Sequence, residues 1–268
     1  MREVAIEHLD DPRVAAYHNV RDADLRARDG LFLTEGRLNV KRLITGSRFR
    51  TRSVLVTETA LRAIRPALER LDTGTPVYVA ASALVADVVG YAMHRGCLAV
   101  GERGAEPELA PFLAGARPRT LLVLEDVSNP ENVGAAFRNA LALGADGVVL
   151  TRRCVDPLYR RTIRVSMGAS LRLGYARAED GAAPLAQLRE AGFTNVALTT
   201  ARDATPLERE RETPRRLALW LGSEGAGLSP DVLAGVKRRV TIPMAPGADS
   251  LNVATACAIA LHHFRALA

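Results

Sequence analysis

The sequence predicts an α/β protein whose second half is built on a mostly parallel sheet. Short apolar runs alternate with segments of helical spacing along the chain, which is typical of parallel strands covered by helices on both faces. A stretch rich in proline, small and charged residues, at 102–118, interrupts this alternation and predicts a linker. We therefore expect a small α/β domain over residues 1–101 and a larger α/β domain over residues 119–268.

The first half contains the weaker signals. Asp11 and Pro12 are typical of a helix start, and we expect one helix from there through residue 28. Phe32 and Leu33 then lead into a further helical segment. Strands are predicted at 54–56, 77–79 and 97–100. Further helices are predicted at 36–44, 60–71 and 82–89.

The second half repeats the alternation with longer apolar runs. Runs of this kind are typical of strands that are buried on both faces. Strands are predicted at 121–124, 147–150, 196–199, 217–221 and 240–242. Helices are predicted at 133–143, 157–166, 184–190 and 251–267.

Composition excludes several classes of protein. The 268 residues are 48% hydrophobic and 25% charged, as in soluble globular proteins. No apolar stretch approaches the roughly 20 residues that span a bilayer, and the N-terminus lacks the apolar core of a secretion signal. We therefore expect a cytoplasmic protein without membrane association. Because Cys97, Cys154 and Cys257 are far apart and form no C-x-x-C pair, we predict neither disulfides nor a metal site.

The net charge of +6 is concentrated in one segment. Seven arginines lie between Arg152 and Arg177, where Asp156 is the only acidic residue. A charge run is often no more than a solvated helix face, but arginine is the side chain best suited to bidentate phosphate contact. The segment therefore favours a nucleic-acid partner. The residues expected to contact its phosphates are Arg152, Arg153, Arg160, Arg161 and Arg164.

Three loops of the second half follow predicted strands. Loop one spans residues 125–134, and Arg138 lies one helical turn further on. Loop two spans residues 221–230 and loop three spans residues 242–252. In open α/β sheets, ligands bind beyond the carboxyl ends of the strands. If the strands are parallel neighbours, the three loops therefore border one crevice.

Each loop also has a purely structural explanation. Asn129 and Pro130 could form a turn, Asn132 could cap the following helix, and Ser250 could cap the last helix. The glycines of loop two resemble a nucleotide-binding loop, but their spacing matches neither the dinucleotide fingerprint nor the phosphate loop. That spacing argues against a Rossmann-type oxidoreductase.

The ordered combination of the loops is more specific. Asn132-x-Gly134-x-x-x-Arg138 is followed by Leu-Gly-Ser-Glu-Gly-x-Gly at 221–227, then by Ile-Pro-Met at 242–244 and Ser-Leu-Asn-Val-Ala at 250–254. This set resembles the SpoU (TrmH-type) family of RNA 2′-O-methyltransferases in the SPOUT superfamily, with no departure at the defining positions. The resemblance covers residues 119–268. Phe-Leu-Thr-Glu-Gly at 32–36 also looks like that family's substrate-binding extension.

The resemblance implies a fold, a cofactor and an assembly. The C-terminal domain would be an α/β trefoil knot, which sequence patterns never predict because knots are nearly absent from proteins. The cofactor would be S-adenosylmethionine, the substrate rRNA or tRNA, and the assembly a homodimer packed through the knotted domain. The positions expected to hold the cofactor are Gly222, Ile242, Leu251, Gly225, Pro243 and Thr199.

The resemblance also implies which side chains act on the ribose, namely Asn132, Arg138, Glu224, Ser250 and Asn252. The family scheme assigns activation of the 2′-hydroxyl to Arg138. Because a guanidinium hardly loses its proton, we expect Arg138 instead to bind the adjoining phosphate and stabilise alkoxide charge, while a phosphate oxygen or water takes the proton. Asn132 and Asn252 would orient the ribose or fix Arg138. Glu224 would either pair with Arg138 or lie near the sulfonium.

Two alternatives keep the fold and change the function. One is a catalytically silent RNA-binding protein, against which the intact Arg138, Glu224, Ser250 and Asn252 argue. The other is a methyltransferase that acts on a base, whose motifs differ from the Asn132–Arg138 set. We therefore predict 2′-O-methylation of a ribose in structured RNA.

Overall fold

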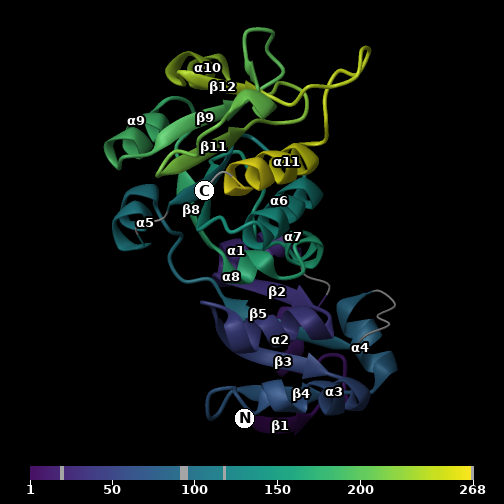
Figure 1. Ribbon diagram of the computed structural model, residues 1–268. Coiled ribbons are helices and arrows are strands. Elements are labelled where there is room, and N and C mark those ends of the chain that lie inside the picture. The colour runs from purple at the N-terminus through teal and green to yellow at the C-terminus, as the bar shows by residue number, and fades with distance from the viewer. Residues whose placement is uncertain (19–20, 91–95, 117–118, 267–268) are drawn as a thin grey trace. The chain divides into compact units, whose positions relative to one another are not determined.

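The computed structural model of the protein describes residues 1–18, 21–90, 96–116 and 119–266. The chain divides into two compact units, each with its own sheet (Figure 1). The N-terminal unit consists of Met1–Ala105 together with Pro157–Arg172, and the C-terminal unit consists of Glu106–Asp156 and Leu173–Ala268. The segment 157–172, predicted to lie in the second domain, therefore groups with the first.

The N-terminal unit is built on a five-stranded mixed sheet in the order β1-β4-β3-β5-β2. β1, β4 and β3 pair in parallel, whereas β5 pairs antiparallel with both β3 and β2. The strands are β1 (Arg2–Ala5), β2 (Leu31–Glu35), β3 (Arg50–Val56), β4 (Pro76–Val79) and β5 (Cys97–Glu102).

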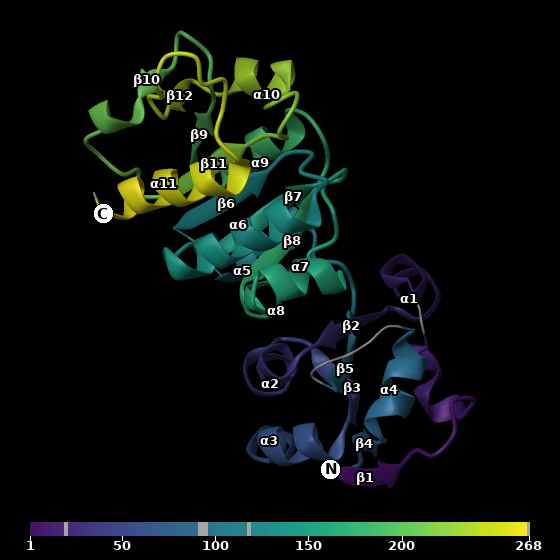
Figure 2. The ribbon, with the colours of Figure 1, turned by 90° about the vertical axis from the view of Figure 1, so that its right-hand side faces the viewer.

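Helices cover both faces of this mixed sheet (Figure 2). On one face Tyr17, Leu25 and Val85, from η1, α1 and α4, share a core with Leu55 and Leu98 of the sheet. α2 and α3 lie on the other face (Figure 2). The helices of the unit are η1 (Pro12–Tyr17), α1 (Asp22–Asp29), α2 (Arg37–Gly46), α3 (Glu58–Leu68), α4 (Ser82–Val89), α7 (Arg160–Val165) and α8 (Ala169–Arg172).

The prediction of one helix over residues 12–28 is wrong. Asp11 does start a helix, since its side chain accepts a hydrogen bond from the backbone N–H of Arg13, but this is the 3-10 helix η1. His18 and Arg21 have extended backbones, and α1 begins only after Arg21. The buried Tyr17 hydroxyl is hydrogen-bonded to Ser53 at 2.7 Å, a tertiary contact that sequence spacing does not reveal.

The C-terminal unit is built on a seven-stranded sheet in the order β10-β12-β9-β11-β6-β7-β8. Every pairing in it is parallel, which confirms the predicted parallel α/β class. Every residue of β7 and β11 is buried, as expected for strands with helices on both faces. The strands are β6 (Thr120–Leu124), β7 (Gly147–Thr151), β8 (Gly174–Ala178), β9 (Thr194–Leu198), β10 (Thr205–Pro206), β11 (Leu217–Leu221) and β12 (Arg238–Thr241).

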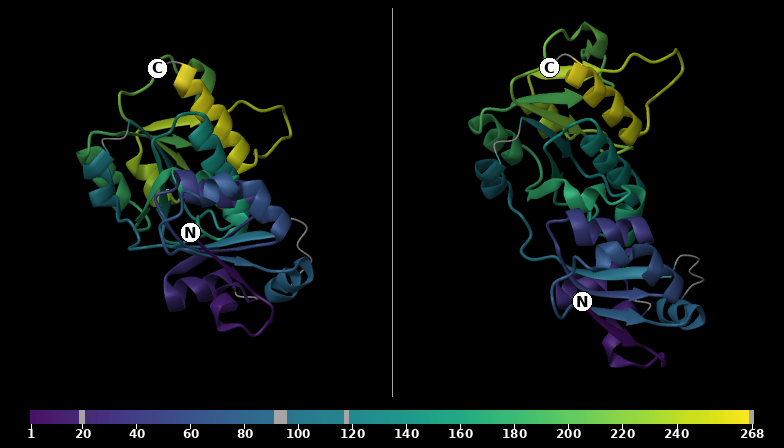
Figure 3. Two further views of the ribbon diagram at one scale, coloured as in Figure 1. Left: turned by 90° about the horizontal axis from the view of Figure 1, so that it is seen from below. Right: turned by 60° about the horizontal axis from the view of Figure 1, so that its bottom comes forward.

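Two groups of helices cover the parallel sheet. α6 (Pro130–Ala142) and α11 (Val253–Ala266) lie side by side on one face (Figures 1 and 3), where the Asn139 side chain donates a hydrogen bond to the Ala254 carbonyl at 2.8 Å. On the other face, leucine and valine side chains from three helices surround Trp220. Those helices are α5 (Leu109–Ala116), α9 (Ala183–Glu190) and α10 (Pro230–Gly235).

Several elements of this unit were not predicted, among them α5 and β8. α5 lies inside the stretch interpreted as a linker, because Leu109 and Leu113 are buried in the core despite the neighbouring prolines. β8 lies in the arginine-rich segment, and its sequence Gly-Tyr-Ala-Arg-Ala has no apolar run. β8 forms an edge of the sheet, where only β7 pairs with it, so the apolar signature of a central strand is absent.

The strand order creates a switch point between β6 and β11. From β6 the chain proceeds outward through β7 to β8, whereas β11, β9 and β12 lie on the other side of β6. At such a point, the connections beyond the carboxyl ends of the neighbouring strands diverge and leave a crevice. Loops one and two leave the sheet here, because they follow β6 and β11.

Candidate active site at the carboxyl edge of the parallel sheet

All three predicted loops lie at the same edge of the parallel sheet. β6 and β11 are hydrogen-bonded neighbours, so loops one and two leave the sheet side by side. β12, which precedes loop three, is separated from β11 by β9. The residues that follow β9, Thr199 and Thr200, occupy this intervening position and border the same hollow as loops two and three.

Loop one leads directly into α6. Asn129 caps this helix by accepting a hydrogen bond from the Glu131 N–H at 2.8 Å, and Pro130 occupies the first helical position. Asn132 therefore lies inside the first turn and is not the cap. Its side chain is only 6% exposed, so its amide must find partners within the protein.

Loop two folds back on itself. The backbones of Ser223 and Gly227 exchange two hydrogen bonds, of 3.2 and 3.0 Å, which close a tight turn. A Cβ on Gly222 would lie 2.0 Å from the backbone carbon of Gly227, so only glycine fits at this position. A Cβ on Gly225 would meet nothing within 4 Å. The closed turn thus requires glycine at position 222, whereas no steric clash requires glycine at position 225.

Asn132, Glu224 and Asn252 are joined by hydrogen bonds. The Asn132 amide nitrogen donates to Glu224 Oε1, which also accepts from Asn252 Nδ2 at 3.4 Å. Asn252 Nδ2 also donates to Asn132 Oδ1 at 2.9 Å. One residue from each of the three loops therefore meets at one point. Glu224 is bound by these two amides and forms no ion pair with any residue that the structure describes, so the predicted pairing with Arg138 is absent. The predicted position near a sulfonium stays a prediction.

Asn252 also caps α11. Its Oδ1 accepts from the backbone N–H groups of Ala254 at 2.9 Å and Thr255 at 3.3 Å. The helix accordingly begins at Val253, two residues later than predicted, and the alternative in which Ser250 caps it is wrong. The capping interaction fixes which end of the Asn252 amide faces Asn132, because its oxygen is already engaged.

A pocket of about 420 Å³ lies between loop two, loop three and the residues after β9, within the usual size range of small-molecule sites. Of the residues predicted to hold a cofactor, five line this pocket: Thr199, Gly222, Gly225, Ile242 and Leu251. Pro243 is not among the lining residues. Glu224 and Ser250 also line the pocket, whereas Asn132 and Asn252 reach it only through Glu224.

The charged side chains that the described residues contribute to the pocket wall are acidic. Glu224 and Asp249 line it, and the described residues contribute no lysine or arginine to its wall. Apolar side chains, such as Leu198 and Met244, form much of the remainder. Carboxylates next to an apolar wall attract a cation and repel phosphates. The pocket therefore suits a small ligand that is partly apolar and positively charged, rather than a nucleotide cofactor.

Arg138 is not part of this cluster. It lies six residues beyond Asn132 on α6, its side chain is exposed, and it makes neither an ion pair nor a hydrogen bond with any residue that the structure describes. Six residues correspond to about 9 Å along a helix, so the two side chains lie on different turns. The structure thus brings Asn132, Glu224 and Asn252 together and leaves Arg138 outside.

The comparisons with known proteins agree with this geometry. The model of the SpoU rRNA methylase family matches residues 119–262, which include all three loops. An uncharacterized tRNA/rRNA methyltransferase of Mycobacterium bovis is 41% identical over 259 residues, which cover 94% of this chain and 88% of that protein. The chain belongs to the SpoU family.

Solved structures similar to this SpoU-family chain match it along almost its whole length. The AdoMet-bound rRNA methyltransferase of Sinorhizobium meliloti superimposes with a TM-score of 0.83 at 24% identity, covering 98% of both chains. A candidate RNA methyltransferase of the TrmH family from Porphyromonas gingivalis gives a TM-score of 0.79 at 27% identity, covering 97% of this chain and 99% of that one. The likeness therefore includes the N-terminal unit.

The arginines predicted to bind RNA are divided between the two units of this SpoU-family chain. Four of them are paired with carboxylates at N–O distances of 2.5 to 2.9 Å. The count of charges along the sequence suggested a surface of unpaired arginines. In the structure these four arginines are paired instead. Exposed ion pairs such as Arg152–Glu179 contribute only about 0–1 kcal/mol, so phosphates can compete for their guanidinium groups. Arg160 and Asp22 are less accessible, with side chains 23% and 19% exposed. The pairs are Arg152–Glu179, Arg153–Asp126, Arg160–Asp22 and Arg164–Glu35, and Arg161 is not free either.

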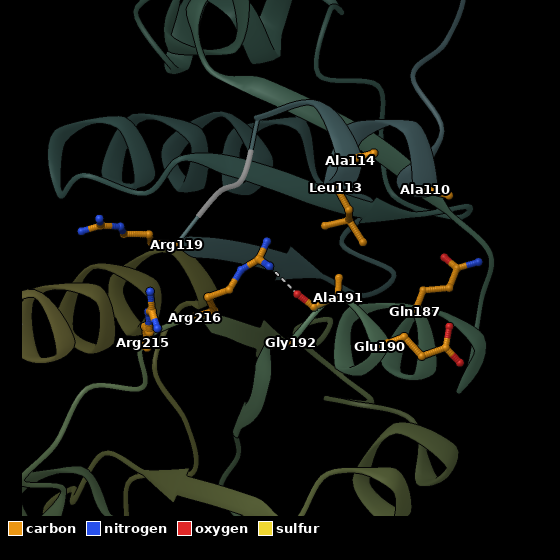
Figure 4. Close-up of a pocket in the computed structure, with 10 residues that line it drawn as sticks. All are labelled: Ala110, Leu113, Ala114, Arg119, Gln187, Glu190, Ala191, Gly192, Arg215 and Arg216. Atoms are coloured by element: carbon orange, nitrogen blue, oxygen red, sulfur yellow. Dashed lines mark hydrogen bonds between the residues drawn. The ribbon is translucent and has the colours of Figure 1, made fainter.

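A larger hollow of about 1030 Å³ lies at the opposite edge of the parallel sheet (Figure 4). It is bordered by Arg119, Gly192 and Arg216, which lie just before β6, β9 and β11. Arg216 is engaged with the protein, since it donates to the Ala191 carbonyl and its guanidinium lies 4.2 Å from the Phe193 ring centre. No residue of the SpoU motifs lines this hollow, so we place the site at the carboxyl edge.

Two kinds of feature are absent from the residues that the structure describes. No group of three or more His, Cys, Asp or Glu side chains is arranged to hold a metal ion, and no helix is long and apolar enough to cross a membrane. Burial raises the pKa of Cys97 and of Cys257 to about 12. These thiols therefore stay protonated at neutral pH and are poor nucleophiles.

Sequence analysis missed several residues of the site. Asp249 contributes a second carboxylate to the pocket, and Met244 and Thr200 line it. Their positions inside or next to the predicted loops are the only signal that could have indicated them. Glu125 was recognised only as the start of loop one, although a carboxylate directly after an apolar strand is a signal in itself, because acidic side chains are rarely buried.

Proposed function

We propose that this SpoU-family chain transfers a methyl group from S-adenosylmethionine to a ribose 2′-hydroxyl of rRNA or tRNA. The observation that carries the proposal is the junction of Asn132, Glu224 and Asn252 beside a pocket that suits a cation. An RNA methyltransferase needs these two features next to each other, one for the methyl donor and one for the nucleotide.

The pocket fits this cofactor chemically. S-adenosylmethionine supplies a methyl group bound to a positively charged sulfur, and the described wall of the pocket carries two carboxylates and no cation. Backbone groups of loop two, beside Gly222 and Gly225, would bind the polar parts. Thr199, Ile242 and Leu251 would enclose the apolar parts, whereas Pro243 would only support the backbone of loop three beside Ile242. Glu224 and Asp249, whose charge is opposite to that of the sulfonium, favour the cation electrostatically.

The side chains around the junction would position the ribose. Asn132 and Asn252 present a fixed set of amide groups because each is held by at least two hydrogen bonds. Ser250 offers a hydroxyl at the rim of the same pocket. Arg138, which is free of carboxylates among the described residues, is available to bind the phosphate next to the target ribose and to stabilise negative charge on the 2′-oxygen.

RNA would be held by both units. Arg152, Arg153, Arg160 and Arg164 would exchange their carboxylate partners for phosphates, and Arg161 would contact the same phosphates. The N-terminal unit, with its own sheet and helices, would choose which RNA is bound. In this proposal specificity comes from that unit and chemistry from the C-terminal one, since a fold alone does not fix a substrate.

The proposal includes an assembly and a topology. The C-terminal unit would form a homodimer through the exposed surface of α6 and α11, where Ile259 is 40% exposed. This surface also presents Arg138, so a second copy would come to lie near the site. The chain after β12 would be threaded as the trefoil knot of the SpoU family, and the enzyme would work in the cytoplasm.

One experiment tests the reaction. The 2′-O-methyl positions of total RNA are mapped in cells with and without the gene, and again with the Arg138→Ala variant. We expect one or a few positions to lose methylation in both the deletion and the variant. Loss of a base methylation instead would favour the base methyltransferase, and an unchanged map would favour the silent RNA-binding protein.

A further inference from the structure

Glu125 is a buried carboxylate to which the proposed reaction assigns no role. It is the first residue after β6 and is only 2% exposed. No basic side chain of the described residues forms an ion pair with it. Burial of a carboxylate costs free energy unless hydrogen bonds compensate, so the partners of Glu125 indicate why it is there.

Both carboxylate oxygens of Glu125 are bound by one residue of loop two. The Ser229 N–H donates to Oε2 at 2.8 Å, and the Ser229 hydroxyl donates to Oε1 at 2.7 Å. Ser229 is also the cap of α10, since its hydroxyl oxygen accepts from the Val232 N–H at 3.3 Å. The Glu125 carboxylate therefore holds the residue that begins α10 through both its backbone and its side chain.

Glu125 also binds the other end of loop two. Its backbone N–H donates to the Leu221 carbonyl at 2.9 Å. Leu221 is the last residue of β11 and Ser229 the residue before α10, so the two contacts bracket the turn that carries Gly222, Glu224 and Gly225. A single residue of loop one thus fixes both ends of the turn that lines the pocket.

We infer that Glu125 is a positioning residue for cofactor binding. By fixing both ends of loop two, it holds the closed turn against the pocket and keeps Glu224 within reach of Asn132. It acts through Ser229 and touches neither substrate nor cofactor. A neutral or apolar residue would suffice to fill the space, whereas the charge is needed to hold the two donors of Ser229. This inference rests on the proposed function.

The test compares four forms of the full chain: wild type, Glu125→Gln, Glu125→Ala and Ser229→Ala. The affinity for S-adenosylmethionine is measured by isothermal titration calorimetry without RNA, next to the melting temperature of each protein. We expect Glu125→Ala to weaken binding about 10- to 100-fold, because it removes two hydrogen bonds to a charged group. Glu125→Gln keeps one acceptor and should lose less, and Ser229→Ala should lie between the wild type and Glu125→Ala.

The double variant Glu125→Ala/Ser229→Ala shows whether the two side chains act on cofactor binding as one hydrogen-bonded unit or independently. If the two side chains act as one unit, the double variant binds the cofactor no more weakly than Glu125→Ala alone. If the losses of cofactor affinity in the two single variants add up in the double variant, the two side chains act independently and the inference is wrong. The KM for RNA is expected to change little in all four forms.

Asn195→Ala provides the matched control. This variant removes the hydrogen bond of 2.8 Å that Trp220 Nε1 donates to Asn195 Oδ1, in the same sheet but away from the pocket. It should lower the melting temperature without changing the affinity for the cofactor. If it weakens binding as much as Glu125→Ala at an equal loss of melting temperature, the effect is general and the inference is wrong. Wild type that does not bind the cofactor would overturn the proposed function. Wild type and Glu125→Ala with equal affinities would overturn only the role of Glu125.

Discussion

The Asn132 amide donates a hydrogen bond to the Glu224 carboxylate, although 92 residues separate them in the sequence. Each reaches this contact from a loop at the end of a different strand, and those strands, β6 and β11, are neighbours in the sheet. The contact converts two separate motifs into one site.

Asn132→Asp tests this contact directly. The substitution keeps the shape of the side chain but places a carboxylate against Glu224, so two acceptors of like charge face each other. We expect single-turnover methylation to fall by at least about 100-fold, as for loss of other preorganised catalytic donors. Asn129→Ala is the control, since it removes the cap of α6 and should cost about 1 kcal/mol of stability while the methylation rate is retained.

Arg138→Ala should separate chemistry from cofactor binding. Arg138 does not line the pocket, so the affinity for S-adenosylmethionine should stay within about twofold of wild type, while the single-turnover rate falls about 100- to 1,000-fold. Arg62→Ala, which changes another exposed arginine on α3 of the N-terminal unit, should leave both quantities unchanged. An Arg138→Ala enzyme with the full single-turnover rate would contradict the charge-stabilising role, and an Arg138→Lys enzyme with the full rate across pH would show that the positive charge suffices without the guanidinium geometry.

Gly222→Ala should open loop two. Its Cβ would lie 2.0 Å from the Gly227 backbone, which the turn cannot accommodate without breaking the Ser223–Gly227 hydrogen bonds. We expect a lower melting temperature and loss of measurable cofactor binding. Gly225→Ala has open space around its Cβ and should melt at the wild-type temperature. Equal melting temperatures for the two variants would show that the turn is not closed as described.

RNA binding should weaken steeply with salt. Each phosphate contact contributes about 0.7 to 0.9 to the slope of log K against log salt concentration. Glu179→Gln releases Arg152 from its carboxylate partner and should strengthen RNA binding, whereas Arg152→Gln should weaken it and reduce the slope by about one contact. A filter-binding series between low and moderate salt measures both effects. A flat response would show that phosphates do not dominate the interaction.

If the chain forms the proposed dimer, a variant that disrupts the exposed face of α11 should halve the mass of the particle in solution. Ile259→Glu places a charge on the exposed face of α11 and should convert dimers to monomers in size-exclusion chromatography with light scattering. Leu9→Glu, at a leucine of similar exposure in the N-terminal unit, should leave the mass unchanged. A wild-type chain that elutes as a monomer at micromolar concentration would contradict the dimer.

The parallel sheet and its loops were predictable because their signals are local. β6, β7 and β11 are continuous apolar runs, and each loop motif directly follows a strand. What sequence could not show depends on contacts between distant residues. Nothing in the spacing distinguishes Ser250 from Asn252 as the cap of α11, and the choice follows from the partner that Asn252 finds in Asn132. The arginines looked unpaired for the same reason, since Asp22 and Glu35 lie more than a hundred positions away.

The division of the chain has a genetic consequence. Residues 157–172 lie between β7 and β8 in the sequence, yet they fold with the N-terminal unit, where Arg160 donates to Asp22 at 2.9 Å. The backbone therefore passes from one unit to the other three times. Cutting the chain at residue 118 would separate α7 and α8 from the strands and helices of the N-terminal unit, with which they fold. The two units therefore cannot be exchanged between proteins by a single crossover.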